Sequence, residues 1–135
     1  MGLGEQVFVD IETPYSGASD NEVRRNIRYA RACMRDCIKK DEVPFASHLL
    51  YTQPGILDDN NPHERETGIL AGKLLITKLE ARTVVYTDLG ISKGMRQGIQ
   101  MAEELGRKIE YRTLGDDWES KMSEIEAQHS HNSVW

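Results

Sequence analysis

The chain lacks the features that mark membrane, secreted and disulfide-bonded proteins. No apolar run approaches the roughly 18–20 residues of a membrane span, and the first residues carry neither the basic nor the long apolar segment of a secretory signal. Only two cysteines occur, Cys33 and Cys37, and their spacing puts them on one face of a helix. We expect buried thiols in a cytoplasmic protein, with a metal-binding pair as the alternative.

Positive charge is scarce as well. Lys and Arg number 17 against 22 Asp and Glu, which leaves a net charge of −5. This deficit argues against a nucleic-acid partner, although a helix terminus binds a small phosphate ligand locally whatever the net charge. The 135 residues suffice for one domain with a hydrophobic core. We place that domain at residues 1–128 and a polar tail at residues 129–135.

Strand patterns alternate with helix patterns along the chain. Short apolar or β-branched runs predict strands at residues 6–11, 43–46, 82–88 and 108–113, and apolar spacing on one face predicts helices at 20–40, 62–79, 92–105 and 116–128. Such alternation predicts an α/β fold with helices on both faces of a parallel sheet. We therefore expect a flavodoxin-like or Rossmann-like three-layer sandwich with a sheet of about four strands.

The predicted helix at residues 62–79 carries two glycines one turn apart, Gly68 and Gly72. Its large apolar residues are expected to face inward: Ile69, Leu70, Leu74, Leu75 and Leu79. Glycines at this spacing indicate that another backbone packs closely on the helix, from the sheet or from a second subunit. We expect a homodimer or a larger homo-oligomer.

The most informative segment is residues 81–95. A β-branched run ends at Asp88, Gly90 makes a turn, and a helix starts near Ser92. A helix N-terminus at the carboxyl end of a strand presents free backbone N–H groups and a positive dipole end, which bind anions. The ligand-binding residues predicted here are Asp88, Ser92, Lys93, Gly94 and Met95. An ordinary capped helix start is the alternative interpretation.

The loop after the first strand is expected to face the same crevice, because the first and third strands of such sheets are often neighbours. It contributes Pro14, Tyr15, Ser16 and Gly17. Tyr15 is suited to stack on a ring, and the Ser16 hydroxyl and Gly17 backbone are suited to bind phosphate. The alternative is an ordinary turn.

Two further residues are candidates for catalysis. His48 directly follows the second predicted strand and so lies near the same edge, and Glu66 lies near the start of the next helix. A carboxylate in a cleft stabilises a ribosyl cation or takes part in displacement at an anomeric carbon. The alternatives are a structural histidine and an acidic residue that complements the helix dipole. No zinc spacing is present, and we expect neither a metal nor a cofactor.

On these motifs the chain resembles the nucleoside 2-deoxyribosyltransferase-like superfamily, most closely its small phage-type members. The matching segments are residues 13–17, 44–49, 64–68 and 91–95, together with Asn26 and Ala30. The resemblance implies a flavodoxin-like or Rossmann-like fold, dimers or larger assemblies, and cleavage of the N-glycosidic bond of nucleosides or their monophosphates. It also implies that Ser16, Gly17, Ser92 and Gly94 hold a 5′-phosphate.

Two departures from that pattern affect the expected function. Active members carry a glutamate where this chain has Gly98, and residues 72–75 lack the acidic residue expected on the second helix. Glu66, Asp58 or Asp88 are the substitutes that the sequence offers. The first hypothesis is therefore a protein that binds a nucleotide-type small molecule, sequestering a metabolite or signal. The alternatives are an N-glycosidase or deoxyribosyltransferase with a displaced carboxylate, and a structural or protein-interaction module.

Overall fold

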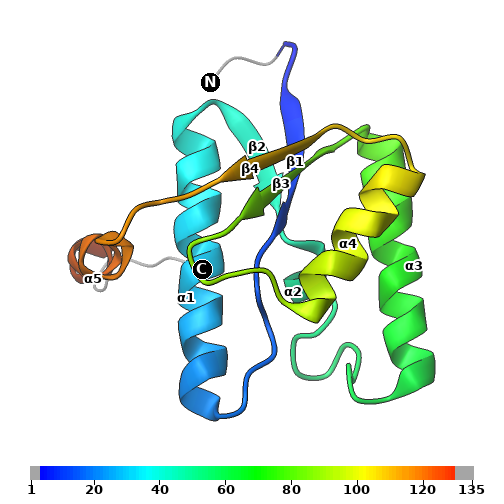
Figure 1. The fold of residues 1–135 in the computed structure, drawn as a ribbon, viewed down its shortest axis with the longest axis horizontal. Helices are drawn as coiled ribbons and strands as arrows, with labels where there is room; N and C mark the ends of the chain where they lie inside the picture. Colours follow the sequence, from blue (N-terminus) through cyan, green and yellow to red (C-terminus); the bar gives the residue numbers. More distant parts are fainter. Residues whose placement is uncertain (1–3, 130–135) are drawn as a thin grey trace.

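The computed structural model describes residues 4–129, which form an α/β fold around a four-stranded, all-parallel sheet (Figure 1). The strand order is β2-β1-β3-β4. The strands are β1 (Val7–Glu12), β2 (Glu42–Phe45), β3 (Arg82–Tyr86) and β4 (Ile109–Arg112). The predicted fold class is therefore confirmed. Residues 130–135 of the predicted tail, His131 among them, lie outside the described part of the chain.

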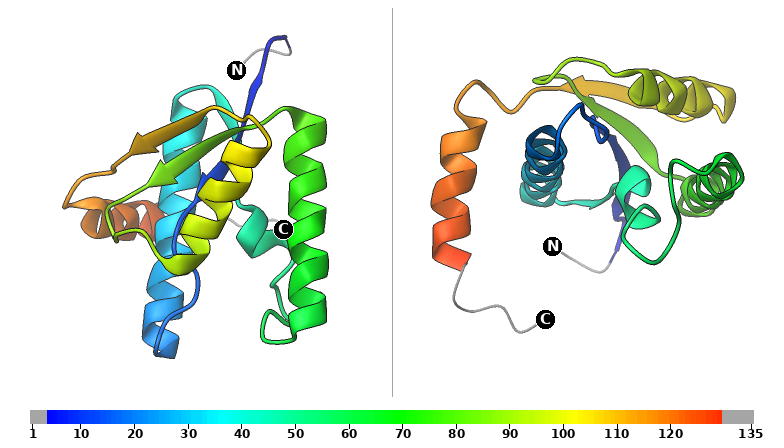
Figure 2. Two further views of the ribbon diagram at one scale, coloured as in Figure 1. Left: turned by 45° about the vertical axis from the view of Figure 1, so that its right-hand side comes forward. Right: turned by 90° about the horizontal axis from the view of Figure 1, so that it is seen from below.

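Helices cover both faces of the sheet, which gives the three layers (Figure 2). The helices are α1 (Asp20–Lys39), α2 (Ser47–Leu50), α3 (Pro62–Leu79), α4 (Lys93–Glu104) and α5 (Trp118–His129). Helices α1 and α5 lie on one face, and α2, α3 and α4 lie on the other. Within residues 4–129, no helix combines the length and the apolar character needed to cross a membrane.

The chain leaves β1 towards β2 on one side, whereas it leaves β3 towards β4 on the other. The strand order therefore reverses between β1 and β3. At such a switch point the loops that follow the two strands diverge towards opposite faces of the sheet and leave a crevice at the carboxyl edge. The fold places the loop after β1 and the turn before α4 at this crevice.

Strand β1 is buried on both faces, but its two faces differ in chemistry. Val9 and Ile11 pack into the core beneath α1. Successive side chains of a strand point to opposite faces, so Asp10 and Glu12 point towards α2, α3 and α4. Asp10 is fully buried and Glu12 is 6% exposed.

The core beneath α1 is built from aromatic and sulfur-containing side chains. Tyr29, Cys33 and Cys37 of α1 pack with Tyr86 of β3 and Trp118 of α5. Both cysteines are buried and free, which confirms the predicted buried thiols. Burial, more than any other cause, raises the pKa of Cys37 to about 11, so this thiol stays protonated and unreactive at neutral pH.

The prediction for α3 is wrong in its orientation. Ile69, Leu70 and Leu74 were expected inside, but they are 47%, 56% and 55% exposed. The buried residues of α3 are Gly72 and Ile76. The helix carries apolar residues on all sides, so their spacing does not distinguish the inner face from the outer one.

The two glycines of α3 make room for residues of the same chain. A Cβ on Gly72 would lie 3.2 Å from the Cβ of Ser47, and one on Gly68 would lie 3.2 Å from Leu57 Cδ1. The close neighbours are therefore α2 and the segment before α3. The connection between β2 and α3 contains α2, and this helix brings Ser47 against Gly72.

Asp88 ties the turn after β3 to two other elements. Its carboxylate accepts hydrogen bonds from the Tyr29 hydroxyl and from the backbone N–H groups of Leu114 and Gly115, the latter two at 2.9–3.0 Å. Burial acts to raise the pKa of Asp88, but the hydrogen bonds from Tyr29, Leu114 and Gly115 outweigh it and lower the pKa. Asp88 thereby fixes the connection between β4 and α5 beside α1.

We predict that Asp88→Ala lowers the free energy of unfolding by about 2–4 kcal/mol, because three donors lose a charged acceptor. Folding lowers the pKa of Asp88. Its contribution to the free energy of unfolding is therefore present above the ordinary aspartate pKa of about 3.9 and is lost as the pH falls below that value. Urea denaturation at several pH values measures both effects. Asp116→Ala, an exposed change in the same connection, is the control; equal losses from both variants would contradict this role.

Candidate functional site

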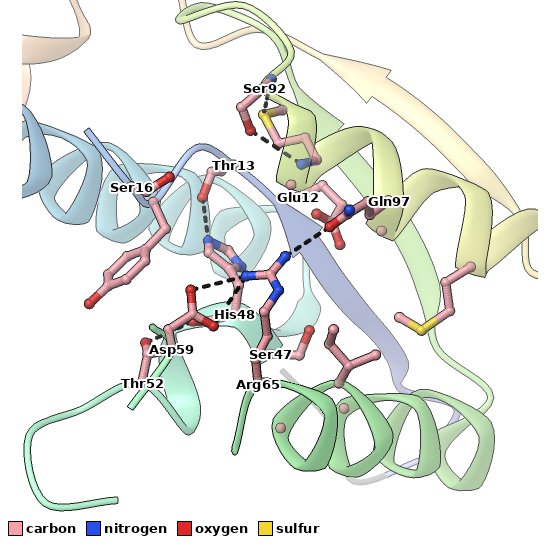
Figure 3. A pocket seen from close by; sticks show the side chains of 18 of the residues that line it. Glu12, Thr13, Ser16, Ser47, His48, Thr52, Asp59, Arg65, Ser92 and Gln97 are labelled. Carbon is pink, nitrogen blue, oxygen red and sulfur yellow. Dashed lines mark hydrogen bonds and ion pairs between the residues drawn. The ribbon is translucent and has the colours of Figure 1, made fainter. Parts of the chain in front are cut away.

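A cavity of about 220 Å³ lies at the carboxyl end of β1, between α2, α3 and α4 (Figure 3). Its lining residues come from five segments of the chain, among them Glu12, Thr13, Tyr15, Ser16, Ser47, His48, Asp59, Arg65, Ser92, Gly94, Met95, Gln97 and Gly98. A wider hollow of about 650 Å³ adjoins it and shares Tyr15, Ser16 and Asp59. Small-molecule sites commonly enclose about 300–1,000 Å³, so the two hollows together offer enough space for such a ligand.

The start of α4 forms one end of the cavity. Ser92 is the N-cap: its hydroxyl accepts a hydrogen bond from the Met95 N–H at 3.2 Å, and its own N–H donates to the Met95 sulfur at 3.4 Å. In the described chain no acceptor pairs with the N–H groups of Lys93 and Gly94. A Cβ added to Gly94 would meet only the Ser92 hydroxyl, at 4.0 Å. These amides and the helix dipole suit this end to an anion.

Glu12 occupies the space beside Gly98 on α4. A Cβ added at Gly98 would lie 2.3–2.5 Å from the carboxyl atoms of Glu12. The carboxyl group of Glu12 therefore fills the volume that any larger residue at position 98 would need. Glu12 also lines the cavity, so this acid faces whatever the cavity holds.

Asp10 lies on the same face of β1 and is fully buried. Its two carboxylate oxygens accept hydrogen bonds from the backbone N–H and the hydroxyl of Ser47, both at 3.2 Å. Burial raises the pKa of Asp10 to about 7, although the bonds from Ser47 act to lower it. Burial, and then the charge of Asp10, hold the pKa of Glu12 well above its usual range.

His48 lines the cavity at the start of α2. Its Nε2 is 2.9 Å from the Thr13 hydroxyl, and its ring meets the Tyr15 ring edge-on at 6.5 Å between centroids. Burial lowers the pKa of His48 to about 4, so the imidazole is neutral at neutral pH. A neutral imidazole serves as a hydrogen-bonding group here and not as a cation.

Arg65 bridges two helices across the cavity (Figure 3). One guanidinium nitrogen is 3.1 Å from a carboxylate oxygen of Asp59, and another donates to the Gln97 side-chain oxygen at 2.8 Å. The bridge joins α3 to α4 above the buried acids. The ion pair between Arg65 and Asp59 is partly exposed. A ligand can therefore replace Asp59 as the partner of Arg65 at a small cost in free energy.

The structure brings most of the predicted ligand-binding residues together. The cavity is lined by Tyr15, Ser16, His48, Ser92, Gly94 and Met95, and Gly17 lines the adjoining hollow. Pro14 and Lys93 lie beside these residues in the chain but do not line the cavity. Asp88 instead accepts a hydrogen bond from the connection after β4, and Glu66 lies on the exposed surface of α3.

Asp10, Glu12 and Gln97 were not among the predicted site residues. The sequence carries a signal for the first two, because polar residues at alternate positions of a strand share one face. The apolar residues at positions 7–9 and 11 obscured this signal, since they suggested a buried strand with apolar side chains on both faces. Nothing in the sequence pairs Glu12 with Gly98, because their contact depends on how α4 packs on β1.

This arrangement defines a doubly wound α/β protein with a cavity at the switch point of its sheet. The chain belongs to the family described as Domain of unknown function (DUF7768), which matches residues 7–112. The matched region runs from the start of β1 to the end of β4, so it contains every residue that lines the cavity. Comparison with curated proteins and with solved structures gives no match.

We predict that Gly98→Ala does not give the gain of about 1 kcal/mol that alanine normally brings to a helix interior. The new methyl group must push the Glu12 carboxyl aside, and we expect a net loss of about 1–2 kcal/mol. In a Glu12→Ala background the same change becomes stabilising, because the clash is gone. Gly94→Ala, where space is open, is the control in urea denaturation; additive effects of the Gly98 and Glu12 changes would contradict this packing.

Proposed function

We propose that this protein binds a nucleoside phosphate or a similar nucleotide-type small molecule in the cavity at the carboxyl end of β1. The observation that carries the proposal is the cavity itself, since it joins the open N-terminus of α4 to the Ser16 loop at the switch point. Doubly wound folds place their ligands at this position. A phosphate fits the Ser92–Gly94 end, where backbone N–H groups lack acceptors.

The rest of the cavity suits the uncharged part of such a ligand. Tyr15 offers an aromatic ring at the shared wall of the two hollows, and Met95 and Ile69 provide apolar contact. Asp59 and Glu64 line the far side, where Asp59 pairs with Arg65. The resemblance to nucleoside 2-deoxyribosyltransferase-like proteins supports the same orientation, with Ser16 and Ser92 at the phosphate.

Calorimetry with nucleoside 5′-monophosphates, ADP-ribose and cyclic dinucleotides tests this proposal. We expect at least one to bind, and we expect Ser16→Ala and Ser92→Ala each to weaken that binding about ten- to hundredfold. A hydrogen bond to a charged phosphate contributes about 1.5–3 kcal/mol. Gly94→Val is expected to abolish binding, because its side chain fills the phosphate end.

The control is Ser120→Ala, which removes a hydroxyl of α5 that donates to the Asp117 carbonyl just before that helix, far from the cavity. Thermal unfolding of each variant separates loss of the Ser92 cap, which itself contributes about 1 kcal/mol, from loss of binding. No heat with any of these ligands at high protein concentration, or equal binding by all four variants, would overturn the proposal.

A second candidate function is cleavage of the N-glycosidic bond of a bound nucleoside monophosphate. One observation favours it: the Glu12 carboxyl group occupies the space beside Gly98, where active members of the resembled superfamily carry a glutamate. In hydrolysis the bond from the anomeric carbon to the base breaks, and its electrons and a proton go to the base. Water then gives its hydroxyl to the anomeric carbon and releases a proton.

We predict that, if the protein is such an enzyme, free base is released from a nucleoside monophosphate and Glu12→Gln slows the release at least about a hundredfold. Loss of a positioned acid or base typically costs 10²–10⁴ in rate. Chromatography of the products measures this. Glu66→Gln is the matched control, because Glu66 is exposed and outside the cavity; release that depends on Glu66 instead, or no release from any nucleotide, would reject Glu12.

A further inference from the structure

The carboxyl group of Glu12 is the most unusual polar group of the cavity. It is 6% exposed, and none of the described residues donates a hydrogen bond to it or forms an ion pair with it. A buried carboxylate without a donor or a cation is costly, and the neutral acid is the form that burial favours. The group faces the cavity, so its missing partner is one that enters from there.

The neighbouring Asp10 shows which acid of the pair holds the proton. Asp10 accepts two hydrogen bonds from Ser47, and such bonds stabilise a carboxylate. Glu12 has no equivalent donor and lies two residues away on the same face of β1. Two carboxylates so placed do not both ionise readily, so Asp10 is the first of the pair to ionise and Glu12 is the one that keeps its proton.

The groups around Glu12 do not supply the missing charge. Strand β3 presents Thr83 and Val85 to this side, and neither titrates near neutral pH. Helix α2 presents His48, which is neutral at neutral pH. Helix α4 lines the cavity with the uncharged Gln97, Gly98 and Met101.

Helix α3 is the remaining neighbour, and it presents Arg65 and Glu64 to the cavity. The Arg65 guanidinium pairs with Asp59 and Gln97 and forms no ion pair with Glu12. Asp10 is thus the nearest charged group that acts on Glu12, and its charge opposes ionisation.

We propose that Glu12 acts as a protonated acid that recognises the base of the bound ligand, donating its O–H to a ring nitrogen or carbonyl oxygen and accepting from an adjacent N–H. This inference rests on the proposed function. A neutral carboxylic acid presents a donor next to an acceptor, which matches the paired groups on the edges of nucleobases. The neutral form also avoids repelling a phosphate held one turn away at Gly94 on α4.

The protonation of Glu12 can be measured without any ligand. In protein labelled with ¹³C at the glutamate side-chain carboxyl groups, one signal is assigned to Glu12 by its absence from Glu12→Gln. We expect this signal to remain in the protonated form at about pH 6, where an unperturbed glutamate with a pKa of about 4.3 is ionised. If it titrates with the exposed glutamates, the inference is overturned.

Calorimetry from about pH 6 to pH 9 with AMP, GMP, CMP and UMP then tests recognition. For the wild type we expect affinity to fall about tenfold per pH unit once Glu12 ionises. Glu12→Gln keeps an adjacent donor and acceptor, so it is expected to bind with little dependence on pH. Glu12→Ala removes both and is expected to bind weakly at every pH, while Glu66→Gln is expected to behave as the wild type.

The two measurements separate the inference from the proposed function. A protonated Glu12 with no binding of any monophosphate would reject nucleotide binding and, with it, the base as the partner of Glu12. Binding that does not change with pH or with Glu12→Gln and Glu12→Ala would retain the proposed function and overturn this inference. Thermal unfolding of each variant at both pH limits shows that the compared proteins are folded.

Discussion

Two buried acids on one face of β1 determine how three helices are placed. Burial of a polar group is tolerated only where hydrogen bonds or space are provided for it. Asp10 receives both bonds from Ser47 at the start of α2, and the glycine at position 72 of α3 accommodates the close approach of Ser47, because a Cβ there would lie 3.2 Å from the Cβ of Ser47. Glu12 requires the glycine at position 98 of α4. The cavity is the space that these packing requirements leave at the carboxyl end of the strand.

The two faces of the sheet satisfy their polar groups differently. Beneath α1, Arg112 binds both carboxylate oxygens of Glu42, at 2.6 and 2.7 Å. On the cavity face, Glu12 has no donor, and His48 Nδ1 and the Thr83 hydroxyl are buried without partners in the part of the chain that the structure describes; on the α1 side the same holds for Arg35 Nε. Buried polar groups in proteins are nearly all paired. Two of these residues, Glu12 and His48, line the cavity, where a bound ligand is able to complete their hydrogen bonding.

The sequence predicts the elements and the capped helix start at one end of the cavity because those depend on local chemistry. Ser92 is recognisable as a cap, and alternation of strands and helices determines the fold class. The orientation of α3 was mispredicted because its apolar residues surround the helix, so only tertiary packing selects the inner face. The function of Asp88 was likewise hidden, since its partners include backbone N–H groups 26 and 27 residues further on, which side-chain patterns do not reveal.

The glycine at position 98 and the glutamate at position 12 are one structural feature. A glutamate on α4 at position 98 would place its first side-chain atom 2.3 Å from Glu12, so the two acids cannot occupy their places together. An acid on β1 reaches the cavity from the sheet, next to Asp10, whereas an acid on α4 would reach it from the helix that covers the sheet. The like charge of Asp10 raises the pKa of the acid on the strand, Glu12, after burial has already raised it. Placing the carboxyl group on β1 beside Asp10 therefore favours its protonated form.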